Sequence, residues 1–180
     1  MKGSKKTVTL NNLIFPLWLL VWLPSWLWLI IIPANYIIDR LVFTFSGKKQ
    51  KPELSNTFFR NETWKLWLIG FGVDFIGSVI LLIPTIIEMI AESIWPDTLS
   101  CSDMWDNFQQ ALSYNCFRNV GALLYAILAV AVAGVLIYIF DKKAVLKMGE
   151  FTEEQAHKVA LSMAIFTAPY LYLVPMELFM

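Results

Sequence analysis

The stretch VGALLYAILAVAVAGVLIYIF, at residues 120–140, contains no Lys, Arg, Asp or Glu. The hydrocarbon core of a bilayer is about 30 Å thick and is crossed by about 20 apolar residues in helical conformation. A helix satisfies its backbone polar groups internally, which an open sheet in lipid does not. The stretch therefore predicts one transmembrane helix.

Three further apolar stretches accompany it along the chain. They are residues 13–38, 66–90 and 159–180. The segments that connect the four stretches are too short to form separate domains. They are residues 39–65, 91–119 and 141–158. We therefore expect an all-α integral membrane protein, with residues 1–180 forming a single membrane domain.

The composition supports this fold class. Hydrophobic residues make up 58% of the 180 residues, charged residues 16%, and the mean hydropathy is +0.60. Soluble domains average about 45–50% apolar and about 25% charged residues, and small domains need the most polar surface. This composition excludes a soluble globular monomer and a disordered chain. The formal net charge of zero lacks the basic excess that phosphate binding requires, so no nucleic-acid partner is expected.

Residues 13–38 differ from the other stretches because Pro24 and Ser25 divide them. Proline removes a helical hydrogen bond and clashes with the preceding turn. Two interpretations stay open: a kinked helix that crosses the membrane, which makes four spans, or a re-entrant hairpin that returns to its own side. Tryptophan prefers the membrane interface, and the segment is rich in it. The expected bundle has three full transmembrane helices plus this Pro/Trp-rich segment.

The basic residues predict an orientation, because short cytoplasmic loops carry an excess of Lys and Arg. Residues 39–65 contain six and residues 141–158 contain four, whereas residues 91–119 contain only Arg118. We therefore expect the first and third loops in the cytoplasm and the second loop outside. The pattern is typical of a multi-pass protein of a cell membrane, and it fits a bacterial inner membrane.

The second loop holds both cysteines, Cys101 and Cys116. Disulfides persist on the oxidising side of a membrane, so the sequence predicts a disulfide between them, with two unpaired thiols as the alternative. Ser102 is a suitable N-cap for a helix, and apolar residues then recur at helical spacing as far as Leu112. We expect a short amphipathic helix on the external side.

Asp74 is the first candidate for a functional residue, because an ionisable group inside an apolar span is costly. It shares a helix face with Gly70, Gly77 and Glu88. Thr167 and Asn35 are expected at a similar depth, within reach of Asp74. Two interpretations stay open: a carboxylate that responds to protons or cations along a polar path, or an aspartate that fixes helix packing. Asp39, four residues after Asn35, is interpreted as a helix end, with a ligand-facing role as the alternative.

Small residues define a packing face on the charge-free stretch. They are Ala122, Ala126, Ala129 and Ala133. Small residues allow membrane helices to approach closely. We expect this face to contact the Gly70 and Gly77 face, or a second copy of the protein.

The chain is poor in catalytic residues. His157 is the only histidine, and the sequence contains no glycine-rich phosphate loop, paired-cysteine metal motif or nucleophile elbow. Asn61, Glu62 and Thr63 match a glycosylation acceptor, which we discount because it lies in the basic loop. Thr152 and Gln155 predict a capping box that starts the last helix near Glu153. We expect no enzyme, no cofactor and no metal site.

Three classes of function follow from these observations. The first is a non-catalytic accessory or assembly subunit of a larger membrane complex. The second is an oligomeric channel or transporter component for protons or cations that uses Asp74. The third and least supported is an intramembrane enzyme. The expected partners are membrane lipid and either further copies of the chain or other membrane subunits.

Overall fold

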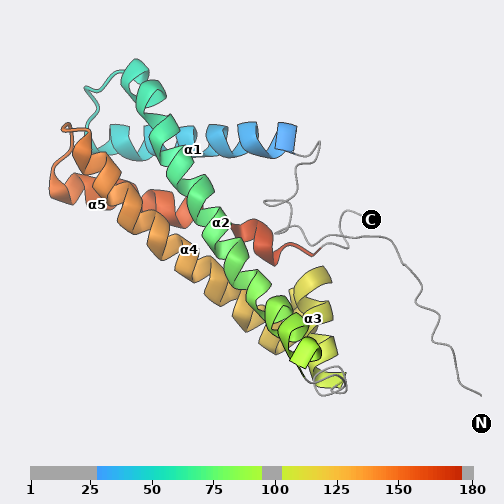
Figure 1. Cartoon of the computed structure of the whole chain (residues 1–180). Helices are drawn as coiled ribbons and strands as arrows, with labels where there is room; N and C mark the ends of the chain where they lie inside the picture. Colours follow the sequence, from blue (N-terminus) through green and yellow to red (C-terminus); the bar gives the residue numbers. More distant parts are fainter. Residues whose placement is uncertain (1–27, 95–102, 176–180) are drawn as a thin grey trace, which may run out of the picture.

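The fold is described here from a computed structural model, which describes residues 28–94 and 103–175. Every regular element in these two ranges is helical (Figure 1). The elements in chain order are α1 (Trp28–Gln50), α2 (Asn56–Ile94), α3 (Asp103–Tyr114), η2 (Cys116–Arg118), α4 (Val120–Lys147), α5 (Glu153–Phe166) and η3 (Tyr170–Leu173).

The two longest helices, α2 and α4, run antiparallel and pack side by side. Helix α5 folds back along α4, and α1 crosses the bundle in contact with α2 and α5 (Figure 1). The short helix α3 packs against the beginning of α4. The C-terminal part of α5 and the turn η3 therefore lie next to α1 and α2, far from them in sequence.

Among residues 28–94 and 103–175, three helices are long and apolar enough to cross a membrane. They are Trp28–Gln50, Asn56–Ala91 and Val120–Lys147. Large apolar side chains stay exposed on them, including Leu29, Phe45, Leu124 and Val135. Exposed apolar surface on this scale is typical of contact with lipid or with another protein. The helical bundle suggests a membrane protein, as the composition predicts.

The apolar stretch that ends at residue 38 does not mark the end of a helix, because α1 continues as one helix to Gln50. Helix α2 likewise begins at Asn56, where the Ser55 hydroxyl accepts a hydrogen bond from the Phe58 amide, rather than at Leu66. Only residues 51–55 connect the two helices. Charged residues end an apolar run without ending a helix, so the apolar runs underestimate the lengths of both helices.

Within the predicted span at residues 159–180, the described residues do not form one of the helices long and apolar enough to cross a membrane. Helix α5 begins at Glu153 with the capping box of Thr152 and Gln155, which confirms that prediction. It ends at Phe166, and Pro169, which has no backbone N–H, then leads into η3. The predicted proline break at Pro24 and Ser25 lies outside the described residues.

The interior holds two apolar clusters. In the first, near the α1–α2 connection, the rings of Phe43 and Phe59 meet edge to face with centroids 5.1 Å apart. The ring of Phe59 also occupies the space that a side chain at Gly47 would need. The second cluster lies between α2, α3, α4 and η3 and includes Leu81 and Tyr172.

The alanine face of α4 is covered within the chain itself. Each of its four alanines is at most 1% exposed. Ala133 belongs to the first cluster and the other three belong to the second. The nearest neighbour of Gly70 is Asp39, and the nearest neighbour of Gly77 is Tyr172. The alanines are therefore not the nearest neighbours of either glycine.

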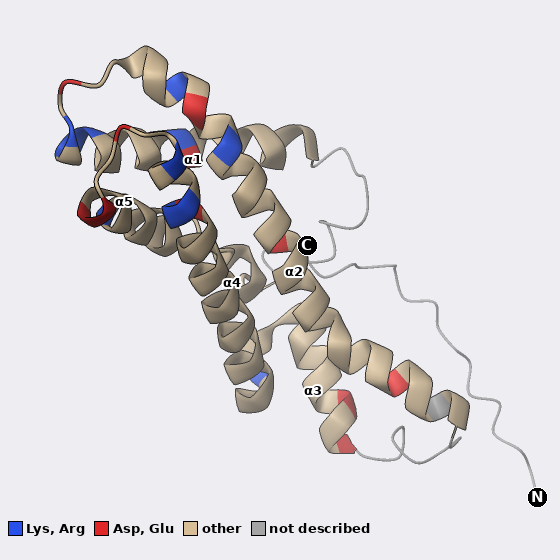
Figure 2. Cartoon of the chain, turned by 60° about the vertical axis from the view of Figure 1, so that its left-hand side comes forward, with Lys and Arg blue, Asp and Glu red and all other residues tan. Residues whose placement is uncertain are grey.

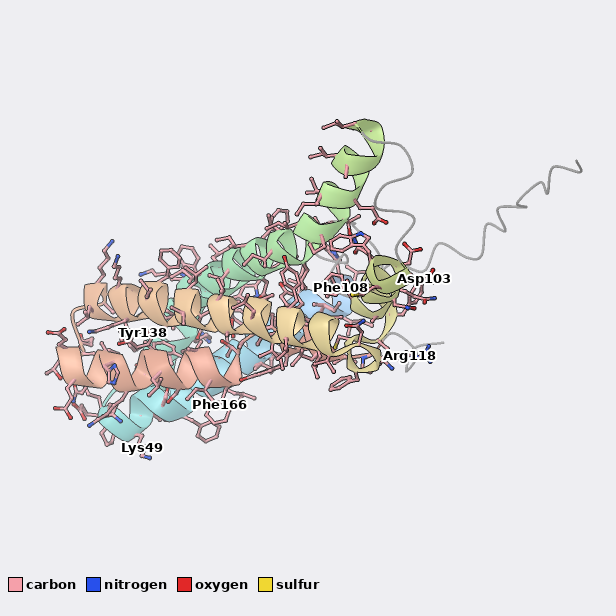
Figure 3. The ribbon with its side chains drawn as sticks, turned by 90° about the horizontal axis from the view of Figure 1, so that it is seen from below. Lys49, Asp103, Phe108, Arg118, Tyr138 and Phe166 are labelled. Atoms are coloured by element: carbon pink, nitrogen blue, oxygen red, sulfur yellow. The ribbon has the colours of Figure 1, made fainter. Side chains whose placement is uncertain are left out.

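Lys and Arg concentrate toward one end of the bundle, where acidic residues lie as well (Figure 2). The basic residues gather where α1 ends, α2 begins and α4 ends, whereas α3, which carries Asp103 and Asp106, lies at the other end. Arg118 also lies at that other end (Figure 3). The concentration of basic residues in residues 39–65 and 141–158 is therefore also a concentration in space.

Candidate functional site: a carboxylate cluster beside a cavity

Three helices each contribute an aspartate to the interior of the bundle. Asp39 of α1 is 6% exposed and Asp141 of α4 is 1% exposed, while Asp74 of α2 is largely buried. Asp39 interacts electrostatically with both of the others. We refer to Asp39, Asp74 and Asp141 as the carboxylate cluster.

Helical periodicity places each carboxylate inside. Asp39 is one and two turns before Phe43 and Gly47, and all three are buried on the same face of α1. Asp141 follows Ala133 and Ile137 and precedes Val145 at four-residue spacing, and all of these are buried on α4. The face that packs each helix into the bundle is thus also the face that carries its acid.

Gly70 brings α1 close to α2 beside this cluster. A Cβ atom at Gly70 would lie 3.6 Å from Oδ2 of Asp39. Gly70 lies one turn before Asp74 on α2, so Asp39 of α1 sits over the same face of α2 as Asp74. The small-residue pattern therefore positions two acids from different helices.

Two of the carboxylates have buried oxygens without partners in the described part of the chain. These atoms are Oδ1 of Asp74 and Oδ1 of Asp141. A buried polar atom without a hydrogen bond costs about 1–3 kcal/mol. A proton, a cation or a hydrogen-bond donor bound at the cluster would remove that cost.

A cavity of about 260 Å³ opens beside Asp39 and Asp74. It lies between α1, α2 and the segment where α5 passes into η3. Its polar lining consists of Asn35, Asp39, Asp74, Thr167, Tyr170 and Tyr172. Its aromatic wall includes Trp28, Trp67 and Phe71. The ring centroid of Phe71 lies 6.1 Å from that of Trp28 and 6.1 Å from that of Trp67.

The candidate residues predicted from the sequence lie in two different parts of the structure. Asn35, Gly70, Asp74 and Thr167 all line the cavity. The Thr167 hydroxyl donates to the Met163 carbonyl at 2.8 Å, so it is engaged with its own helix.

Glu88, in contrast, lies toward the far end of α2. One oxygen of its carboxylate accepts a hydrogen bond from the Gln109 amide of α3 at 3.0 Å. Glu88 therefore helps to join α2 to α3 and is not among the residues that line the cavity.

The sequence predicts a ligand-facing role for Asp39 only as the alternative to a helix end, although its spacing from Asn35 places both residues on one face. Sequence reasoning missed Asp141, which falls in the predicted loop of residues 141–158. The four-residue spacing from Ile137 to Asp141 was the signal that could have found it.

Tyr172 joins η3 to α2 next to Asp74. Its hydroxyl donates a hydrogen bond to the backbone carbonyl of Asp74. Gly77 makes room for the ring, since a Cβ atom there would lie 2.9 Å from one ring carbon. The segment after α5 is thereby held as one wall of the cavity.

His157 and the cysteines lie elsewhere. Nδ1 of the exposed His157 is 2.8 Å from the Tyr138 hydroxyl. Cys116 is a buried free thiol whose sulfur lies 3.8 Å from the Leu173 carbonyl, and burial raises its pKa. Cys101 lies outside the described residues, so the disulfide stays a prediction. Within residues 28–94 and 103–175, no three His, Cys, Asp or Glu side chains form a group that could hold a metal ion.

Comparison of the chain with protein-family models, curated proteins and solved structures finds no match. Any function must therefore be argued from the carboxylate cluster and the cavity themselves.

Proposed function

We propose that the protein is a multi-pass membrane protein that binds and moves protons or cations through the carboxylate cluster. One observation carries the proposal: three apolar helices each turn an aspartate toward the interior of the bundle, where Asp39 interacts electrostatically with both Asp74 and Asp141. This develops the transporter or channel interpretation of Asp74 with two further residues.

The cost of burying acids supports this proposal. Ionisable residues within membrane helices are expensive and are found where ions or protons pass. Ionised carboxylates at the cluster would also repel one another, so binding of a proton or a cation relieves repulsion as well as desolvation. A purely structural role would be served at lower cost by an uncharged polar residue.

The cavity supports a path from the cluster toward the surface of the bundle. Asp39 and Asp74 line it, whereas Asp141 of α4 is not among the lining residues and interacts electrostatically with Asp39. The cavity thus gives a solute access to two of the three acids. On this proposal, Asp74 and Asp39 exchange protons or cations with the cavity, and Asp141 tunes the charge of Asp39.

We also propose that the basic end of the bundle faces the cytoplasm and that α3 lies outside, in a bacterial inner membrane. The excess of Lys and Arg at one end supports this orientation. A disulfide between Cys101 and Cys116 would then lie on the oxidising side.

A second candidate function is that of an accessory subunit. The end of α2 bends away from the long axis of the bundle while Glu88 keeps it in contact with α3 (Figure 3). This end exposes Ile86, Ile87 and Ile90. Such a surface fits contact with lipid, with a second copy or with another membrane subunit.

A flux measurement tests the transport proposal. Purified full-length protein is reconstituted into liposomes that contain a pH-sensitive dye, and a potassium diffusion potential is applied. We expect proton flux with the wild type and loss of most of it with Asp74→Asn. Glu88→Gln is the matched control, because it removes a partly buried acid of the same helix away from the cluster, and it should keep the flux.

Two results would contradict the transport proposal. One is the absence of flux of protons and of simple cations with correctly folded wild-type protein. The other is flux that Asp74→Asn leaves unchanged. Absence of flux together with co-purification of a defined membrane partner would favour the accessory subunit instead.

A further inference from the structure

We infer that the cavity beside the carboxylate cluster binds an organic ammonium ion, a primary or secondary amine in its protonated form with a small apolar group. The inference deepens the proposed function, on which it rests for the role of the cluster, because it names the class of cation.

The charge of the cavity lining selects a cation. Asp39 and Asp74 are the ionisable acids among the described residues that line it, and none of these residues is Lys, Arg or His. An anionic ligand would meet two carboxylates with no balancing cation in the lining. A positive ligand reduces the repulsion between them.

The two acids lack hydrogen-bond donors, which favours a ligand that carries N–H groups. Asp39 is 6% exposed, and no described residue donates a hydrogen bond to it or forms an ion pair with it. Oδ1 of Asp74 is buried and equally without a donor in the described chain. The N–H groups of a primary or secondary ammonium supply the missing donors, and charge-assisted hydrogen bonds of this kind are strong.

The aromatic residues of the lining select an apolar and aromatic environment for the rest of the ligand. Trp28 and Trp67 flank Phe71, one edge to face and the other stacked. Faces of such rings attract ammonium groups and pack against apolar groups. An inorganic cation would be attracted by the two carboxylates but would make no apolar contact with these rings.

The size of the cavity limits the ligand. Its volume of about 260 Å³ lies just below the range of about 300–1,000 Å³ that is common for ligand pockets. An amine with a single ring or a short aliphatic chain fits this space. A large multi-ring cation does not.

A binding measurement with 2-phenylethylammonium as the probe tests the inference. The probe is titrated into full-length protein in detergent micelles at neutral pH, and heat release is recorded. 2-Phenylethanol, which has nearly the same shape and no charge, serves as the matched ligand. We expect the ammonium to bind at least about tenfold more tightly than the alcohol. Equal affinities, or no binding of either probe, would overturn the inference.

Variants locate the binding to this cavity. Asp74→Asn keeps the shape of the side chain and should weaken ammonium binding at least about tenfold. Trp67→Leu removes an aromatic face, keeps both acids and should also weaken it. Glu88→Gln should bind as the wild type does. If Asp74→Asn does not fold, the affinity of Trp67→Leu for the ammonium probe decides the test. If Glu88→Gln weakens binding of the probe as much as either variant does, the inference is overturned.

The two proposals fail separately. Proton flux that depends on Asp74, without ammonium binding, overturns this inference and leaves the proposed function intact. Ammonium binding that depends on Asp74, without any flux, supports the site and counts against transport.

Discussion

The hydroxyl of Tyr125 on α4 donates a hydrogen bond of 2.6 Å to the backbone carbonyl of Ile80 on α2. Within a helix that carbonyl would accept from the amide four residues later, but Pro84 occupies that position and has no N–H. Inside an apolar span no water replaces the missing donor. A side chain of α4 therefore supplies the hydrogen bond that the backbone of α2 lacks at this position.

Removal of the Tyr125 hydroxyl is expected to destabilise the bundle. Tyr125→Phe keeps the ring and leaves the Ile80 carbonyl without a donor, so we expect a loss of about 1–3 kcal/mol in the free energy of unfolding. Denaturant unfolding in detergent micelles measures it. Pro84→Ala restores an amide donor to α2, so the same Tyr125→Phe change should cost clearly less in that background. Equal losses in both backgrounds would show that the hydroxyl does not compensate for the proline.

Gly77 is expected to tolerate no side chain, because Tyr172 fills the space beside it. A Cβ atom would lie 2.9 Å and 3.0 Å from two atoms of the tyrosine. Gly77→Ala should cost about 1–3 kcal/mol through this overpacking.

Gly72 on the same helix provides the control for that substitution. A Cβ atom there meets nothing within 4 Å. Gly72→Ala should therefore be neutral or stabilise by about 0.5–1 kcal/mol, since glycine is unfavourable inside a helix. Thermal unfolding of both variants compares the two positions, and a Gly77→Ala protein as stable as the wild type would rule out the close packing of Tyr172.

Labelling from outside the cell should distinguish the two ends of the bundle. Lys49 and Asp103 lie at opposite ends, and both are exposed (Figure 3). In a background with Cys101→Ala and Cys116→Ala, we expect Asp103→Cys to react with a membrane-impermeant maleimide in intact cells. Lys49→Cys should react only after permeabilisation. The reverse pattern would contradict the proposed orientation, and reaction of both would contradict a crossing between them.

The thiol of Cys116 should react slowly in the reduced, folded protein. Burial raises its pKa, so less of the reactive thiolate is present at neutral pH, and the surrounding atoms restrict access. Mass spectrometry after a timed reaction with iodoacetamide measures this, with denatured protein as the fast reference. Reaction at the same rate in both states would contradict the burial. The same spectra without reductant test the predicted disulfide, which would lower the mass by two hydrogens.

Several features followed from local sequence alone. The capping box of Thr152 and Gln155 is confirmed, because it depends on four consecutive residues. The amphipathic helix after Ser102 extends over Asp103–Tyr114 with Ala111 and Leu112 buried, as the spacing predicted. Helices α1 and α2 extend beyond the apolar stretches that end at residue 38 and begin at residue 66, since an apolar run measures lipid contact rather than the length of a helix.

The sequence by itself determined that this is a helical and strongly apolar chain, where its charge-free stretch lies, and that Asp74 shares a face with small residues. These are properties of single segments, because composition and helical periodicity can be read within one segment without knowing its neighbours. Only the tertiary structure decided that Asp39 interacts with both Asp74 and Asp141, and that Asp39 and Asp74 line one cavity. The burial of a side chain depends on which face of its helix the other helices cover, and that choice is made by packing between segments distant in the chain.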